Sequence, residues 1–335
     1  MSTEDRHGLG DPRIPWVVLL DLTWTDPPQA SALADRLAGL SREARWPLPL
    51  PDAVITGEPR QLLGALTTSS TQALRLGRHE GGLVLAARHE ALDGLAMLSA
   101  ARHLLGEVRS SARGLPPDVA GSGPGALVRR ATEVLVRPPA RVAPSRSGTG
   151  TGDSFASTSV EASPRTADLV HAGARAIAAW NTERGRASRR ISVAVGASTL
   201  GGNAEDLRDA SAFLRLTDVE AMNADEVRAA LAAAPVQPGG GGVTAGLLGR
   251  ALRPAARLAA PRLGSTLLVS HLGTLDADEH LSAAAFYPVT GGGSGLSLGA
   301  ATLRSTTTIT LRARASQHDD DALQQLLERV VAELD

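Results

Sequence analysis

Apolar residues in the first third of the chain alternate between short continuous runs and helical spacing. The run over 15–24 predicts a strand, and Ala and Leu at helical spacing predict a helix over 29–40. Residues 59–76 fit a helix or a mixed element. A second apolar run predicts a strand over 83–87, and helical spacing over 95–108 predicts the helix that follows it.

The second half of the chain repeats this mixture. Helical spacing predicts helices over 166–183, 224–233 and 319–334. Apolar or β-branched runs predict a strand over 189–196, a strand over 267–273 that runs into a turn, and two strands within 296–314. Strands and helices in both halves indicate an α/β or α+β fold with two lobes of similar size.

The composition changes sharply in the middle of the chain. Residues 137–153 are first rich in Pro and then rich in Gly and Ser, which is typical of a linker. A chain of 335 residues also exceeds the size at which one core usually keeps growing. We therefore expect an N-terminal lobe over 1–140, a linker over 141–153 and a C-terminal lobe over 154–335.

Composition narrows the possible partners. Hydrophobic residues make up 43% of the chain but aromatic residues only 2%, so little surface is available to stack on bases. The net charge of −1 gives no reason to expect a polyanionic partner. The first ten residues are polar, and no apolar run approaches the length that spans a membrane. We expect a soluble, cytoplasmic protein that binds neither nucleic acid nor membranes.

Two residue types are missing, and each absence excludes some chemistry. Without Cys there is no thiol nucleophile and no thiolate metal ligand. Lys is also missing, since all 34 Lys and Arg positions are Arg. The chain therefore can form no lysine Schiff base and has no P-loop lysine. Codon bias in a GC-rich genome, such as that of an actinomycete, explains the missing Lys.

The most informative local pattern is the expected strand, turn and helix around His89. Histidine is the side chain whose ordinary pKa lies nearest neutrality, so His89 at a strand end is a candidate general base. The alternative is a hydrogen-bonded structural histidine. Asp93 is likewise placed to cap the helix that begins near Leu95, and Gly94 allows a sharp bend.

This segment resembles acyltransferases of the chloramphenicol acetyltransferase-like fold, which include condensation domains, plant BAHD acyltransferases, polyketide-associated acyltransferases and wax-ester synthases. Their shared signature is His-His-x-x-x-Asp-Gly, and Arg88-His89-Glu90-Ala91-Leu92-Asp93-Gly94 matches it at every position but the first. Later segments are similar to this family in the same order. They are the helix over 166–180, the strand over 191–198, the pair Gly202-Asn203 and the segment 269–273.

The resemblance implies two lobes with a channel between them and His89 at its middle. His89 would take the proton of an alcohol or amine acceptor as it attacks a thioester carried by coenzyme A or by a carrier protein. Asp93 would hold the turn through a structural ion pair, and the N–H of Gly94 would help to bind the oxyanion. The thioester would be a co-substrate, and no metal or other cofactor would be permanently bound.

The chain also departs from the family pattern. Arg88 stands in place of the first His, and His271 replaces the Asn of a late Ser-Asn-x-Gly segment near the channel. No Arg follows the strand over 191–198, where the family often supplies the partner of the motif Asp. The Asp-Phe-Gly-Trp-Gly motif of the plant enzymes is missing. We expect Arg88, Ser270 and His271 to line the substrate channel.

These departures leave two alternatives open. The same pocket could run a cyclisation, dehydration or isomerisation, or the protein could be a non-catalytic partner of a carrier protein.

Four arginines could meet the phosphates of coenzyme A or form a solvated helix face: Arg250, Arg253, Arg257 and Arg262. The glycine-rich segment 291–295 lacks the lysine of a phosphate loop and is predicted to join two strands.

Overall fold

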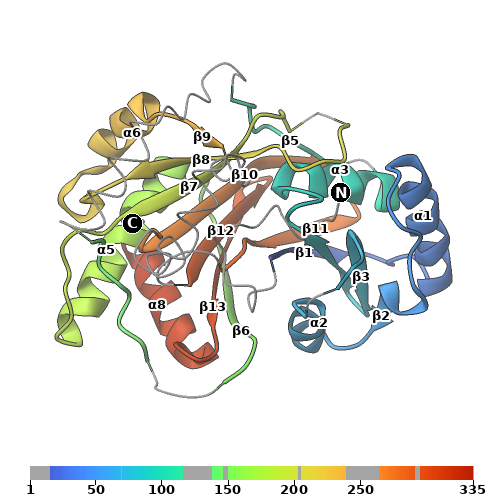
Figure 1. Ribbon diagram of the computed structural model, residues 1–335, viewed down its shortest axis with the longest axis horizontal. Coiled ribbons are helices and arrows are strands. Elements are labelled where there is room, and N and C mark those ends of the chain that lie inside the picture. Colours follow the sequence, from blue (N-terminus) through green and yellow to red (C-terminus); the bar gives the residue numbers. More distant parts are fainter. Residues whose placement is uncertain are drawn as a thin grey trace, which may run out of the picture.

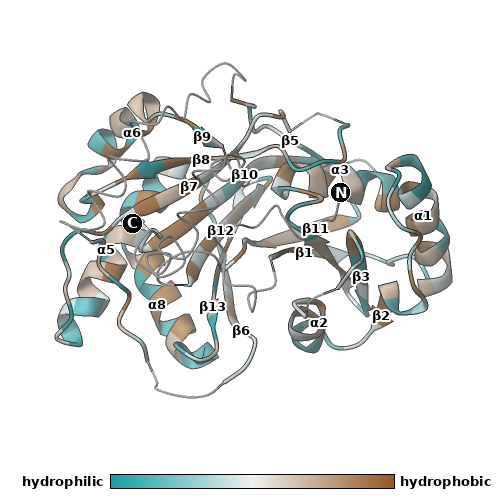
Figure 2. Cartoon of the chain, in the orientation of Figure 1, coloured by the Kyte–Doolittle hydropathy of each residue, from teal (hydrophilic) through white to brown (hydrophobic). Residues whose placement is uncertain are grey.

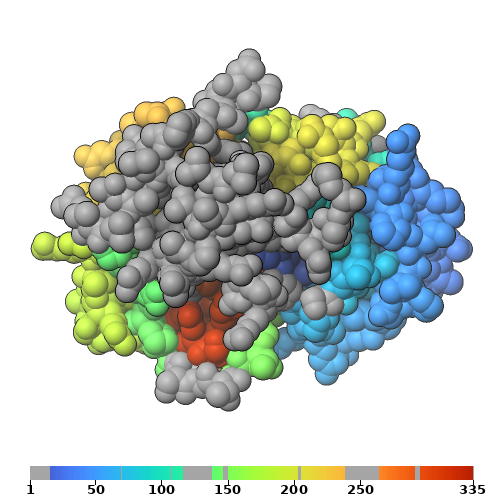
Figure 3. Space-filling view, viewed as in Figure 1, coloured from blue at the N-terminus to red at the C-terminus, as the bar shows by residue number. Residues whose placement is uncertain are grey.

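The computed structural model describes residues 16–334 apart from 69, 107, 116–137, 146–149, 203–204, 239–263 and 291–294. Within these residues the chain forms two lobes, each built on its own sheet (Figure 1). In the space-filling view, N-terminal residues in blue gather on one side, and green, orange and red residues gather on the other (Figure 3).

The smaller sheet forms the frame of the N-terminal lobe. Its described strands lie in the order β11 (Leu281–Tyr287), β1 (Val17–Trp24), β4 (Gly82–Arg88), β3 (Leu74–His79) and β2 (Val54–Thr56). All neighbours are antiparallel except β2 and β3, which are parallel.

Three helices cover this sheet: α1 (Ala30–Glu43), α2 (Pro59–Leu66) and α3 (Gly94–Leu105). Alternate residues of β1 face opposite sides because side chains along a strand alternate. Leu20 and Leu22 lie in one core with α1 and α3, whereas Leu19 lies in another core with α2. The sheet is therefore buried on both faces.

The larger sheet forms the frame of the C-terminal lobe. Its described strands run in the order β6 (Asp153–Val160), β13 (Thr306–Arg314), β12 (Leu296–Leu303), β10 (Leu267–Ala277), β7 (Val193–Ser198), β8 (Ser211–Leu216) and β9 (Gln237–Pro238), and β5 (Val108–Ser110) pairs with the far end of β10. Parallel pairing of β10 with both β7 and β12 makes the sheet mixed.

Helices α5 (Thr166–Glu183) and α8 (Asp320–Ala332) pack on one face of the larger sheet, and α6 (Ala224–Ala233) packs beside α5. Buried residues of α5 and α8, among them Trp180 and Leu326, share a core with Leu267 and Val269 of β10. Strands β7 and β10 are mainly hydrophobic, as their brown colour shows (Figure 2).

The predicted mixture of strands and helices in two lobes is confirmed. The helix expected over 166–183 coincides with α5, and the range 59–76 divides into α2 and the start of β3. The turn expected at the end of 267–273 is wrong: β10 continues to Ala277. Gly273 adopts a φ of 79°, and an irregularity in the pairing with β12 lets the strand pass this point.

The two lobes exchange strands, which the sequence does not predict. The sequence predicts a C-terminal lobe over 154–335, and β11 from this range pairs with β1 in the smaller sheet. In return, β5 from the range 1–140 pairs with β10. Of the expected linker, residues 141–145 and 150–153 are described, and Val142 and Ala143 are buried in the core of the larger sheet.

Candidate active site

His89 lies in the turn that joins β4 to α3. Strand β4 ends at Arg88, whose carbonyl accepts the N–H groups of Ala91 and Leu92 at 2.8 and 3.1 Å. The N–H of His89 itself donates to the carbonyl of Trp16 at 2.7 Å, just before β1 begins. These bonds fix the backbone of His89 at the point where the buried strand ends.

The side chain of His89 is partly exposed, with 22% of its surface accessible. Its Nδ1 lies 3.8 Å from Oδ1 of Asp209, and its ring lies 6.3 Å from that of Trp16. Within the described part of the chain, Nε2 of His89 has no hydrogen-bond partner. A neutral imidazole has one donor and one acceptor nitrogen, so a carboxylate beside Nδ1 and an open Nε2 form the arrangement that a general base requires.

Asp93 is buried at the start of α3, with only 3% of the residue exposed. Its Oδ1 accepts the N–H of Ala96 at 2.9 Å, and its Oδ2 accepts the hydroxyl of Ser198 at 2.7 Å and the N–H of Ala210 at 3.3 Å. Burial raises the pKa of Asp93, and the bonds from Ala96 and Ser198 only partly oppose this shift. The carboxyl therefore joins one lobe to two segments of the other.

These contacts correct one expectation and confirm another. The predicted ion pair of Asp93 is not found, because the groups that bind its carboxyl in the described residues are neutral donors. The role of Asp93 as the cap of α3 is confirmed. Ser198 ends the strand after which no Arg follows, and its hydroxyl supplies a hydrogen bond without burying a cation.

Gly94 begins α3 and packs tightly against the C-terminal half of the chain. A Cβ at this position would lie 2.9 Å from Cδ2 of Leu272 and 2.9 Å from Cζ of Phe286. Any side chain here would force the Leu272 or Phe286 side chain to shift. The glycine thus permits close contact between the lobes, and its role in binding an oxyanion stays a prediction.

Arg88 lies at the other end of the motif, and its guanidinium forms an ion pair with Glu90. Its Nη1 also donates to the carbonyl of Thr71 at 3.3 Å. The first contact lies within the turn, and the second ties the arginine to the segment that precedes β3. That Arg88 lines a substrate channel stays a prediction.

Ser270 lies on the face of the larger sheet that is turned toward Asp93. It pairs with Gly196 of β7, where an added Cβ would lie 3.0 Å from Oγ of Ser270. Ser198, which binds Asp93, lies two residues further along β7 and therefore on the same face. That Ser270 contacts a substrate stays a prediction.

His271 follows Ser270 and therefore lies on the opposite face. Its Nδ1 lies 3.3 Å from Oγ1 of Thr166, the first residue of α5. Burial lowers its pKa to about 4, so the ring is neutral at physiological pH. His271 lies within β10 and not at a strand end. The structure brings Ser270, and not His271, to the side of Asp93; whether His271 lines a channel stays a prediction.

Asp209 and Ser198 are the site residues that the sequence analysis missed. Both come from the C-terminal lobe and lie more than a hundred residues from the motif, so no local spacing connects them with His89. Ser198 could have been found, since it occupies the end of a strand that the resemblance had singled out. Nothing in the sequence distinguishes Asp209 from its exposed neighbour Asp206.

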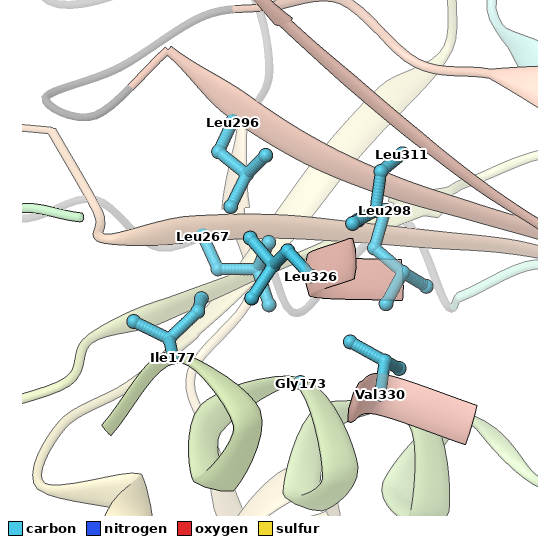
Figure 4. Close-up of a pocket in the computed structure, with 8 residues that line it drawn as sticks. All are labelled: Gly173, Ile177, Leu267, Leu296, Leu298, Leu311, Leu326 and Val330. Carbon is cyan, nitrogen blue, oxygen red and sulfur yellow. The ribbon is translucent and has the colours of Figure 1, made fainter. Parts of the chain in front are cut away.

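A narrow apolar gap lies elsewhere, between α5, α8 and the larger sheet (Figure 4). It leaves no room for a water molecule and has no polar lining group, so it offers no catalytic chemistry. Its lining residues are Gly173, Ile177, Leu267, Leu296, Leu298, Leu311, Leu326 and Val330.

The described residues contain no group of three or more His, Asp or Glu that could hold a metal ion. In the same part of the chain no helix is long and apolar enough to cross a membrane. The four arginines within 250–262, Asn203 and most of the segment 291–295 lie outside the described residues.

Comparison with sequence-family models finds no match, and comparison with curated protein sequences finds none either. Solved structures do match over nearly the whole chain. The cyclization-docking bidomain of the EpoB nonribosomal peptide synthetase from Sorangium cellulosum has a TM-score of 0.56 at 13% identity, covering 99% of this chain and 81% of that one. The first condensation domain of the calcium-dependent antibiotic synthetase, solved with a substrate analogue, has a TM-score of 0.53 at 16% identity, covering 98% of this chain and 96% of that one.

A third similar structure is the condensation domain of the Monacolin K polyketide synthase MokA, with a TM-score of 0.51 at 12% identity, covering 97% of this chain and 93% of that one. At such identities the likeness shows the fold alone. The chain therefore has the two-lobed, chloramphenicol acetyltransferase-like fold of condensation domains, as the resemblance predicted.

Proposed function

We propose that this protein is an acyltransferase of specialised metabolism in which His89 is the general base. The observation that carries the proposal is the setting of the His89 ring. Its Nδ1 lies 3.8 Å from the Asp209 carboxylate, its Nε2 has no partner among the described residues, and its turn is anchored by the buried Asp93. Acyl transfer is chosen by analogy with condensation domains, which share this fold.

In this mechanism the acceptor is an alcohol or an amine and the donor is an acyl thioester. Nε2 of His89 takes the acceptor proton while the acceptor oxygen or nitrogen attacks the thioester carbonyl. The bond from acceptor to carbonyl carbon forms first, giving a tetrahedral oxyanion. Its collapse breaks the carbon–sulfur bond, and the leaving thiolate takes the proton back from His89. The N–H groups at the start of α3, near Gly94, are the candidate donors to the oxyanion.

The donor would be carried by coenzyme A or by the phosphopantetheine arm of a carrier protein. Condensation and cyclization domains of peptide and polyketide synthetases share this fold, which supports a carrier-bound intermediate. The proposed reaction is complete with two substrates and a base, and it has no step that requires a metal or a redox cofactor.

Thiol release tests the proposal directly. Acetyl-, malonyl- and longer acyl-coenzyme A, and the same acyl groups on a carrier protein, are offered with a panel of alcohols and amines. Transfer releases one free thiol for each acyl mass added to the acceptor, and His89→Ala should abolish both signals. Conversion of a tethered intermediate without thiol release would instead favour cyclisation, dehydration or isomerisation. A carrier protein that binds equally to wild type and His89→Ala, with pathway flux unchanged, would favour a non-catalytic partner.

A further inference from the structure

We propose that Asp209 is the positioning residue for His89, holding the imidazole with its proton on Nδ1 so that Nε2 is free to act as the base. This inference rests on the proposed function for its kinetic consequence, but the contact itself does not. The carboxylate and the ring lie 3.8 Å apart, and each side chain is only about one-fifth exposed, with 23% of Asp209 accessible.

The motif carboxylate cannot serve this purpose. Both oxygens of Asp93 are already used, one by the N–H of Ala96 and the other by the Ser198 hydroxyl and the Ala210 N–H. Among the described acidic side chains, Asp209 is the one within ion-pair distance of His89. The two carboxylates therefore have different roles: Asp93 fixes the turn, and Asp209 faces the His89 ring.

Asp209 is itself held in place by the segment that precedes β8. The N–H of Ser211 donates to Oδ1 of Asp209 at 2.9 Å, and the next residue, Ala210, is fixed by its bond to Asp93. At the start of the segment, Glu205 pairs with Arg102 of α3 at 3.2 Å. This segment of the C-terminal lobe thus lies against the motif helix at both of its ends.

The position of Asp209 has a chemical consequence. A neutral imidazole carries its proton on one nitrogen, and a carboxylate near Nδ1 favours the proton there because N–H can then point toward negative charge. After Nε2 accepts the acceptor proton, the same carboxylate stabilises the imidazolium that forms. A distance of 3.8 Å exceeds a hydrogen bond, and such contacts commonly shorten when substrate binds.

Nitrogen NMR of the histidine ring tests this inference in the full-length protein without any substrate. The chain is labelled with ¹⁵N-histidine, and the His89 signals are assigned by their loss in His89→Ala. In wild type at neutral pH we expect the Nδ1–H tautomer. In Asp209→Asn, which keeps the shape and the bond from Ser211, the balance should move toward the Nε2–H tautomer.

Asp206→Asn is the matched control, because Asp206 lies in the same segment but pairs with Arg208 at 3.6 Å. It should leave the His89 spectrum unchanged. Asp209→Ala is the second variant, and it should change the tautomer in the same direction. An identical His89 tautomer in wild type, Asp209→Asn and Asp209→Ala would overturn the inference.

A kinetic readout separates positioning from binding. Asp209→Asn should lower kcat about 10- to 100-fold with KM little changed, as is typical when a group that orients a reacting residue is removed. Asp209→Glu should recover part of the loss. Unaltered kcat in Asp209→Asn would overturn the positioning role. Because the spectra need no substrate, a wild-type protein that releases no thiol would contradict the proposed function alone.

Discussion

The carboxylates of Asp93 and Asp153 are both removed from solvent, but different kinds of group bind them. Asp93 is bound by a hydroxyl and two backbone N–H groups, all neutral. Asp153 instead forms an ion pair with Arg312, with 2.6 Å between Nη2 and Oδ2 and a second contact of 2.8 Å from Nε. Among the described residues, Asp93 has no ion-pair partner where the family resemblance implied one, and a buried ion pair stands instead between Asp153 and Arg312.

The difference shows what each carboxylate is for. Arg312 of β13 also donates to the carbonyl of Val17, the first residue of β1, at 2.7 Å, and to that of Pro288, just after β11, at 3.1 Å. Burial lowers the pKa of Arg312, and Asp153 opposes this shift. A cation that satisfies several acceptors is suited to join two lobes, whereas neutral donors around Asp93 leave His89 with a different carboxylate, Asp209, as its partner.

The largest effect should come from breaking the ion pair at the junction. Arg312→Met leaves Asp153 buried without its cation and removes donors from two carbonyls, which should lower the free energy of unfolding by about 3–5 kcal/mol. Urea denaturation measures this loss. The double variant Asp153→Leu/Arg312→Met should recover part of it, and a single variant as stable as wild type would show that the pair does not join the lobes.

Removing the motif carboxylate should cost less. Asp93→Ala takes away the helix cap and leaves the Ala210 N–H and the Ser198 hydroxyl without their acceptor, for a loss of about 2–3 kcal/mol in the free energy of unfolding. Ser198→Ala, which removes one of these bonds, is the milder control in the same denaturation experiment. An Asp93→Ala protein with full stability and activity would mean that this turn does not depend on its carboxyl.

The stability of the protein should depend on pH through the carboxyl of Asp93. The pKa of Asp93 is raised in the native state above its ordinary value of 3.8. The native protein then keeps this proton to a higher pH than the unfolded chain does. The stability contributed by the neutral acid is therefore present below the unfolded pKa and is lost as pH rises through the raised pKa.

Asp93→Asn removes this titration. The cost of the substitution should therefore be larger at about pH 4 than at about pH 7. Urea denaturation of both proteins at the two pH values gives the comparison. A cost that grows toward neutral pH would show that the pKa of Asp93 is lowered by its donors instead.

The smallest effect tests how tightly the Asp93 turn packs between the lobes. Gly94→Ala places a methyl group 2.9 Å from Leu272 and Phe286, and the repacking should cost about 1–2 kcal/mol of thermal stability. Gly64→Ala is the matched control within α2, because nothing lies within 4 Å of its Cβ position. This control should stabilise the protein by up to about 1 kcal/mol. Equal melting temperatures for the two variants would contradict close packing at Gly94.

Local features were predicted well from the sequence because they depend on neighbouring residues. The periodicity of α5, the apolar run of β1 and the cap at Asp93 each follow from residues within a few positions of one another. The motif turn around His89 belongs to the same class. Its strand, turn residues and helix are adjacent in the sequence.

Contacts between distant segments were not predictable in this way. No spacing connects β11 with β1, Arg312 with Asp153, or Asp209 with His89, since the members of each pair lie more than a hundred residues apart in the sequence. The turn that was wrongly predicted at Gly273 also involves distant segments. A glycine with positive φ usually ends a strand, but pairing with β5 and β12 extends β10 beyond Gly273. Within the described part of the chain Asp93 is bound by neutral donors, and one of them, Ser198, lies more than a hundred residues away in the sequence.

Turnover by His89→Ala tests the central claim most directly. The rate of thiol release is measured for wild type and variant with the same thioester and acceptor, together with the melting temperature of each protein. Loss of the general base should lower the rate by about 100-fold or more, while the partly exposed ring should contribute little to stability. A folded His89→Ala protein that turns over at the wild-type rate would contradict the account.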